Sequence, residues 1–187
     1  MKRTLIAACI AAAIVAFNAS EAQAIAIQYD TLVTDTGWRY TYTVSDFVFG
    51  ANQVLYIDFD STLYSDLQDT SPSDNAGWST LIFPTSDLPT GSFVALSPDP
   101  GASPAEPFTV EFTWLGTGTP GAQLFYLIQL NAAGDALYQF AADGSVLTGD
   151  PGSGPTGTTQ PTPEPATLGL LTMGAAIACA ARRRRRQ

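Results

Sequence analysis

The segment 58–69 carries acidic and hydroxyl side chains at the positions that bind calcium in an EF-hand-like loop. Positions one, three, five, seven, nine and twelve are held by Asp58, Asp60, Thr62, Tyr64, Asp66 and Asp69. Oxygen atoms of this kind are the ligands that Ca²⁺ takes from proteins. However, Leu63 stands where such a loop needs glycine, and Asp69 is shorter than the usual bidentate glutamate. The sequence therefore predicts either a calcium site made by Asp58, Asp60, Asp66 and Asp69, or a solvated acidic loop.

The residue inventory excludes most kinds of covalent and hydrolytic catalysis. The chain has no histidine, and Lys2 is its single lysine. Ser-His-Asp triads, histidine zinc sites and lysine Schiff bases therefore have no candidates. A glycosidase-like carboxylate pair remains, with candidates Asp58, Asp60, Glu106 and Glu111. Because scattered acids on a solvated β-surface are the commoner case, the sequence favours a non-catalytic domain without a cofactor other than calcium.

Two short motifs have enzyme-like patterns that turns explain better. Asp35-Thr36-Gly37 is the aspartic-protease triplet, but the chain has one copy and that chemistry needs two carboxylates brought together. Gly116–Gly121 has the glycine spacing of a dinucleotide-binding loop, whose phosphate site needs a following helix. A β-rich segment follows instead. We therefore expect a turn at both places.

Short segments of alternating apolar and polar residues predict the fold. The expected strands cover about residues 27–34, 38–45, 53–60, 78–83, 92–97, 108–115 and 122–131, with two short ones after them. Residues 64–75 are rich in Asp and Ser and are predicted to be a loop. No segment of the domain has a 3.6-residue apolar stripe. The pattern predicts an all-β fold, an antiparallel β-sandwich or jelly roll, in which 116–121 turns between the clearest pair of strands.

The segment 108–114 predicts which face of one strand is buried. Phe108, Val110, Phe112 and Trp114 alternate with polar residues, so all four are expected to point into the core. Trp114 lies beside the glycine-rich turn and has a second interpretation, in which its exposed ring stacks on sugars.

The N-terminal residues 1–24 have the order of a secretory signal peptide. Lys2 and Arg3 precede an apolar run, and Ala22-Gln23-Ala24 fits the small-residue cleavage pattern. We expect export through the Sec machinery and cleavage by signal peptidase after Ala24. Both cysteines, Cys9 and Cys179, lie outside the domain that we expect at 25–150. That domain therefore has no disulfide bond.

The C-terminal residues 163–187 have three parts. Pro163, Glu164 and Pro165 come first, an uncharged apolar run follows over 166–181, and the arginines Arg182, Arg183, Arg184, Arg185 and Arg186 close it. Because arginines are costly in hydrocarbon, this pattern predicts a single transmembrane helix with a stop-transfer cluster. Residues 151–162, rich in Gly, Pro and Thr, are predicted to be a flexible linker.

This tail resembles the PEP-CTERM sorting signal of Gram-negative bacteria, the substrate of membrane proteases called exosortases. The resemblance covers about the last 25 residues and rests on motif order, spacing and terminal position. It implies that the protein lies only transiently in the inner membrane. It also implies a cut near Pro163-Glu164-Pro165 and release to the cell surface or extracellular matrix, commonly alongside exopolysaccharide.

The charge of the exported part restricts its partners. Residues 25–165 keep 16 of the 17 acidic residues and one basic residue, Arg39. Nucleic acid binding needs clustered Lys and Arg and is therefore excluded. We expect a non-catalytic structural or adhesive protein of the biofilm matrix, with exopolysaccharide as a partner. The alternatives are a secreted carbohydrate-active enzyme that uses acidic residues, and a calcium-dependent carbohydrate-binding module.

Overall fold

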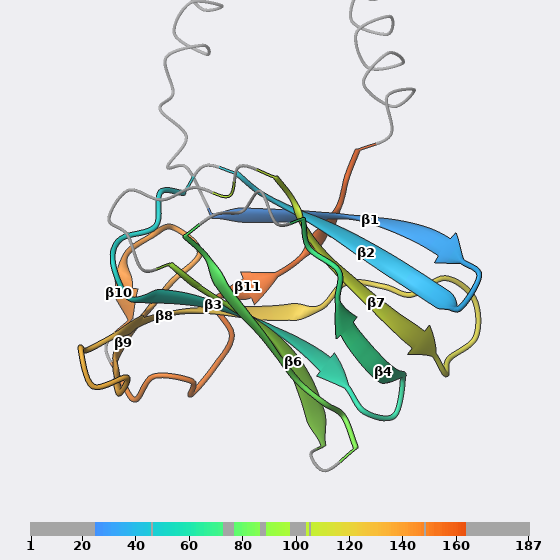
Figure 1. Cartoon of the computed structure of the whole chain (residues 1–187). Helices are drawn as coiled ribbons and strands as arrows, with labels where there is room; N and C mark the ends of the chain where they lie inside the picture. Colours follow the sequence, from blue (N-terminus) through green and yellow to red (C-terminus); the bar gives the residue numbers. More distant parts are fainter. Residues whose placement is uncertain are drawn as a thin grey trace, which may run out of the picture.

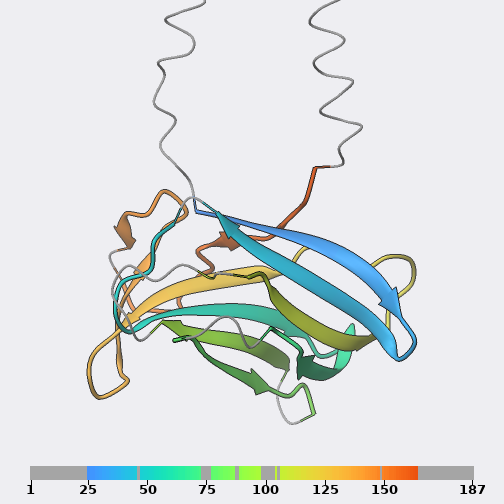
Figure 2. The same cartoon turned by 45° about the horizontal axis from the view of Figure 1, so that its top comes forward.

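The protein folds as two β-sheets packed face to face (Figures 1 and 2). The computed structural model describes residues 25–45, 47–72, 77–86, 89–97, 104, 106–147 and 149–163. These residues form strands and no helix, so none of their segments is a helix long and apolar enough to cross a membrane. The expected signal peptide 1–24 and transmembrane helix 166–181 lie outside the described residues.

The first sheet has five strands in the order β12-β1-β2-β7-β4. Its strands are β1 (Ala26–Thr34), β2 (Gly37–Ser45), β4 (Tyr64–Asp69), β7 (Phe108–Trp114) and β12 (Gln160–Pro161). Neighbours are antiparallel except β12, which pairs parallel to β1. Asp35 and Thr36 form the β1–β2 hairpin turn, as expected, and Thr34 pairs with Gly37.

The second sheet has seven strands, with the path β10-β9-β8-β3-β6-β5 and β11 beside β8. Its strands are β3 (Gln53–Asp60), β5 (Ser79–Phe83), β6 (Thr90–Ser97), β8 (Leu124–Leu130), β9 (Ala136–Phe140), β10 (Val146–Leu147) and β11 (Gly157–Thr158). All its pairs are antiparallel. The prediction of an all-β sandwich is confirmed.

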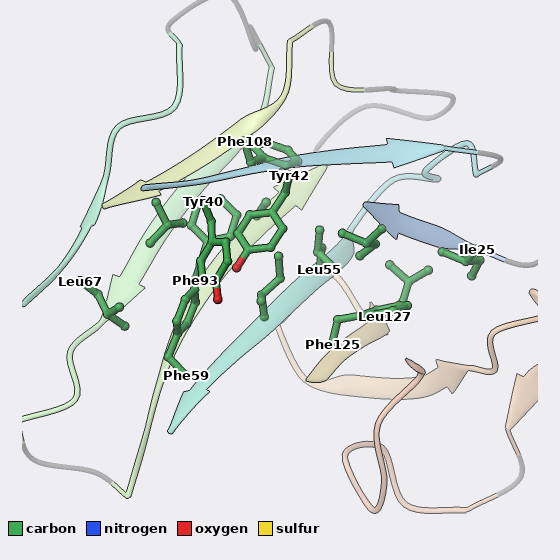
Figure 3. Packing of buried hydrophobic residues seen from close by; sticks show 14 of the residues in the cluster. Ile25, Tyr40, Tyr42, Leu55, Phe59, Leu67, Phe93, Phe108, Phe125 and Leu127 are labelled. Atoms are coloured by element: carbon green, nitrogen blue, oxygen red, sulfur yellow. The ribbon is translucent and has the colours of Figure 1, made fainter. Parts of the chain in front are cut away.

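The core lies between the two sheets and is rich in aromatic rings (Figure 3). Alternation places Leu55, Ile57 and Phe59 of β3 inward, and each is at most 1% exposed. The expected inward face of β7 is confirmed at Phe108, Val110 and Phe112. Burial of each such side chain contributes about 1.5–3 kcal/mol to stability. Because residues 25–163 contain no cysteine, the domain is stabilised by this core and not by disulfide bonds.

β4 was not expected, because residues 64–75 were predicted to be a loop. A bulge breaks its alternation. Ser65 pairs with Thr113 and Gln68 pairs with Glu111, so β4 has one residue more than β7 between these two pairs. Asp66 takes a positive φ of 53° at this point, and Leu67 turns inward to 8% exposure. Because a bulge shifts the side-chain period, a search for strict alternation misses this strand.

The connection between β7 and β8 also differs from the expectation. Residues 108–115 and 122–131 were predicted to flank a turn as a strand pair, but β7 pairs with β2 and β4 while β8 pairs with β3, β9 and β11. Residues 115–123 therefore cross from one sheet to the other. A glycine-rich run predicts a change of direction, but it does not say which sheet receives the next strand.

The predicted flexible linker 151–162 is corrected by the structure, because much of it is part of the fold. Thr156 and Thr159 are 6% and 1% exposed. The Thr156 hydroxyl accepts a hydrogen bond from the Leu127 N–H at 2.9 Å, and the Thr162 N–H donates to the Tyr29 carbonyl at 3.0 Å. Composition indicated flexibility, but these threonines satisfy backbone groups of neighbouring strands. The folded domain therefore extends to about Pro163.

A fragment that ends at Asp150 should consequently be less stable than one that ends at Pro163. It loses β11, β12 and the hydrogen bonds of Thr156, and each buried polar group left unpaired costs about 1–3 kcal/mol. Thermal unfolding of fragments 25–150 and 25–163 measures the difference. Equal melting temperatures would show that the last two strands do not stabilise the domain.

Candidate functional site

Two connections pass between the sheets at the same end of the sandwich (Figure 1). Residues 61–63 lead from β3 in the second sheet to β4 in the first, and residues 115–123 lead from β7 back to β8. The Leu115 N–H donates to the Leu63 carbonyl at 2.8 Å and ties the connections together. Ser61 joins them to the start of β6, because its N–H donates to the Pro89 carbonyl at 3.1 Å. This end is therefore held by backbone hydrogen bonds.

A buried network of polar groups supports the connections from inside. Tyr40 and Tyr42 extend from β2 into the space between the sheets (Figure 3). The Gln123 amide nitrogen donates to the hydroxyls of Tyr40 at 2.6 Å and Tyr64 at 2.9 Å. The Tyr42 hydroxyl donates to the Gln123 amide oxygen at 2.9 Å. Through these bonds Gln123, which is 3% exposed, links three tyrosines of the first sheet to the segment that enters β8.

The two buried tyrosines predict a loss of stability at alkaline pH. Burial raises the pKa of both Tyr40 and Tyr42 well above the usual value near 10, and the neighbouring Tyr64 raises that of Tyr40 further. Above about pH 10 the unfolded chain releases protons that the folded chain retains, so stability present below that pH is lost as the pH rises. Denaturant unfolding from neutral pH to pH 11 should show this fall, and Tyr42→Phe should flatten it. An identical slope in Tyr42→Phe would contradict the assignment.

A groove of about 870 Å³ lies next to this network, and Tyr64 and Gln123 are part of its lining. Asp58 and Asp60, which lie two residues apart on the outer side of β3, line it. Burial raises the pKa of the Asp58 carboxyl, and the Ser92 hydroxyl, which donates to it at 2.8 Å, partly offsets this. Hydrogen bonds from the hydroxyl and N–H of Thr62, at 2.7 and 2.8 Å, lower the pKa of Asp60. The groove therefore holds two carboxylates in different environments.

Aromatic side chains form other parts of the groove. Trp114 lines it and packs at the edge of the core, with its ring centroid 4.9 Å from that of Tyr64. Trp114 is half-buried, so its expected place in the core is confirmed in part, and its role as a sugar platform stays a prediction. Tyr126 also lines the groove, and burial and then the charge of Asp58 raise its pKa. Sequence patterns indicated neither Tyr126 nor Gln123, since nothing local marks residues that only the strand pairing brings to the groove.

The predicted calcium site is not formed. Asp58 and Asp60 lie on the second sheet, whereas Asp66 and Asp69 lie on β4 in the first. Asp66 accepts a bond from the Ser65 hydroxyl at 2.9 Å, and Asp69 accepts one from the Ser71 N–H at 2.8 Å. Across the described ranges, no group of three or more His, Cys, Asp or Glu is placed to hold a metal ion. The physical reason is that a strand replaces the second half of the expected loop.

The other candidate carboxylates do not join the groove. Glu111 accepts a hydrogen bond from the Arg39 Nε at 2.9 Å across β2 and β7 and is ion-paired with that guanidinium. Glu106 lines a small separate hollow with Thr43 and Pro107. Of the four acids considered for a glycosidase, the structure brings together Asp58 and Asp60 alone. The loop 116–121 leads into β8 rather than a helix, so it lacks the helix that would bind a pyrophosphate.

The expected processing residues lie at or beyond the ends of the described domain. Ile25 is 6% exposed, and its N–H donates to the Ala142 carbonyl at 2.6 Å. Pro163 is exposed and lies two residues after the end of β12. Ala22, Ala24, Glu164, Pro165 and the arginines 182–186 fall outside the described residues. The folded domain therefore fills the interval between the two expected cleavage sites.

A family model described as the PEP-CTERM protein-sorting motif matches residues 161–186. The chain carries a PEP-CTERM sorting motif. The motif implies export, exosortase processing and sorting to the cell surface in Gram-negative bacteria. The match begins at Pro161, the last residue of β12, so the matched stretch starts at the end of the folded domain.

The domain itself has weaker likenesses to known proteins than the sorting motif has. No curated protein matches the sequence. Among solved structures, it is similar to a cohesin module from a family 33 glycoside hydrolase of Clostridium perfringens ATCC13124. The match covers 74% of this chain and 98% of that chain, with a TM-score of 0.34 and 8% identity. The description of this domain as a β-sandwich rests on the strand pairing given above.

Proposed function

We propose that this protein is an exported β-sandwich that exosortase delivers to the cell surface or to the extracellular polysaccharide matrix, where it has a non-catalytic structural or adhesive role. The sorting motif at 161–186 carries the proposal. In this proposal, residues 1–24 direct the chain to the Sec machinery, and signal peptidase cuts after Ala24. The apolar run 166–181 then spans the inner membrane until exosortase cuts near Pro163-Glu164-Pro165.

The position of the folded domain supports release in one piece. Ile25 begins at a hydrogen bond to Ala142, and Pro163 follows the pairing of β12 with β1. Cuts on either side of this interval leave every described strand intact. The domain is also strongly acidic, with one basic residue between 25 and 165, so we expect little affinity for nucleic acid or anionic lipid.

One observation favours a second candidate, a secreted carbohydrate-active enzyme. Asp58 and Asp60 line the same groove, and their pKa values are shifted in opposite directions. Glycosidases assign acid and base roles to carboxylates that differ in this way. We rank this function second, because Asp60 already accepts two hydrogen bonds from Thr62 and is exposed.

The two functions differ in what the protein does to a polysaccharide. The released protein is mixed with the exopolysaccharide of its producer, and sedimentation and new reducing ends are measured together. We expect the protein to sediment with the polymer and to release no reducing ends. If the wild type produced new reducing ends and the Asp58→Asn variant did not, the result would instead support the enzyme.

A further inference from the structure

The groove is lined by aromatic side chains together with hydrogen-bonding groups. Tyr126 comes from β8 and Trp114 from the end of β7. Thr62 and Thr90 add hydroxyl groups to the same lining. The volume of about 870 Å³ lies within the range of about 300–1,000 Å³ that is typical of small-ligand sites. A short oligosaccharide presents the complementary features, namely apolar ring faces and polar edges.

The indole of Trp114 is held in one orientation beside the groove. It packs against Tyr64 on the strand β4, and the backbone of Gly116 lies close to it. A Cβ atom built at Gly116 would lie 2.4 Å from the ring, so only glycine allows this close approach. Among the described side chains, the Trp114 Nε1 is a buried donor without a hydrogen-bond partner. Because buried polar groups are usually paired, this donor is an exception at the edge of the groove.

The charge of the groove selects among polysaccharides. Asp58 and Asp60 line it, and none of its described lining residues is Lys, Arg or His. Arg39 is the one basic residue between 25 and 165, and Glu111 on the first sheet holds it. A polymer of uronic acids would therefore be repelled, whereas protonated sugar amines would be attracted.

We propose that the groove binds a short stretch of an amino-sugar polysaccharide, whose amines pair with Asp58 and Asp60 and whose ring faces pack on Tyr126 and Trp114. This assignment rests on the proposed matrix role and names the ligand class for it. A basic peptide would satisfy the two carboxylates as well. The aromatic rings and the threonine hydroxyls in the lining favour the glycan.

Calorimetric titration of the full chain in mild detergent tests the assignment. The probes are a glucosamine hexamer, its N-acetylated form, an alginate hexamer and hexalysine, in mildly acidic buffer that keeps the amines protonated. We expect the glucosamine hexamer to bind most tightly, with an affinity that falls as salt is added. The double variant Asp58→Asn, Asp60→Asn should bind it at least about tenfold more weakly, as expected for lost charge-assisted hydrogen bonds.

Two further variants keep the result interpretable. Asp30→Asn, Asp35→Asn removes the same charge from the exposed β1–β2 hairpin and should leave binding unchanged. Tyr126→Leu removes an aromatic face without changing charge and should also weaken binding, while circular dichroism confirms that every variant is folded.

Equal binding of the glucosamine hexamer by the wild type and by the double variant at Asp58 and Asp60, or no binding by either, would overturn the assignment. So would equal or tighter binding of the N-acetylated hexamer, the alginate hexamer or hexalysine. Since the unprocessed chain is used, these outcomes are independent of sorting. Sedimentation with the exopolysaccharide and the intact mass of the released product test the proposed function separately.

Discussion

Replacing Gln123 with leucine should lower the free energy of unfolding by several kcal/mol. The Gln123 amide bonds the hydroxyls of Tyr40, Tyr42 and Tyr64, and a leucine side chain would leave these buried groups without their shared partner. Each buried polar group left unsatisfied costs about 1–3 kcal/mol, and Tyr42 loses the acceptor of its hydroxyl. Denaturant unfolding of the fragment 25–163 measures the change.

An exposed glutamine provides the matched control for this substitution. Gln68 lies on β4 with an exposed side chain, so Gln68→Leu should change stability by no more than about 0.5 kcal/mol. If both variants lost a similar free energy of unfolding, the effect would come from replacing glutamine with leucine in general and not from the buried network.

Phe108→Ala should cost about 3–5 kcal/mol, as expected for truncation of a fully buried aromatic residue. Phe108 is 0% exposed and joins the sheets, because its ring centroid lies 5.5 Å from that of Phe93 on β6. Its centroid also lies 5.3 Å from that of Trp78. The melting temperature should fall on the order of 10 °C or more, since a domain of this size loses a few degrees per kcal/mol.

Leu137→Ala is the control for the core, because Leu137 is 54% exposed on β9. We expect it to melt close to the wild type. A Phe108→Ala domain that melts within a few degrees of the Leu137→Ala domain would show that the two sheets are not packed as described.

The strands that alternate strictly were predictable from the sequence. β3 has the expected bounds, Gln53–Asp60, and β7 buries Phe108, Val110 and Phe112 as expected. These strands are readable because each has one face in the core, which forces a period of two. β4 was missed because its bulge at Asp66 breaks that period, and β11 and β12 were missed because each has two residues in a segment rich in Gly, Pro and Thr.

The candidate site was only partly predictable for a different reason. The sequence marks Asp58 and Asp60 as candidate acidic ligands and Trp114 as a candidate sugar platform, each from its own local pattern. Their grouping with Tyr126 and Gln123 depends on two connections that cross between the sheets at one end. Strand order across sheets is set by long-range pairing, which local patterns do not encode. The same long-range pairing separates Asp66 and Asp69 from the other two aspartates.

The intact mass of the protein released by its Gram-negative host tests exosortase processing most directly. We predict a released product that begins at Ile25, ends near Pro163-Glu164-Pro165 and lacks Arg182 to Arg186, and we predict that deletion of the exosortase abolishes it. Alanine at Pro163, Glu164 and Pro165 should also abolish release without changing the folded domain. A released product that retains Arg182 to Arg186, or undiminished release without the exosortase, would contradict the proposed delivery.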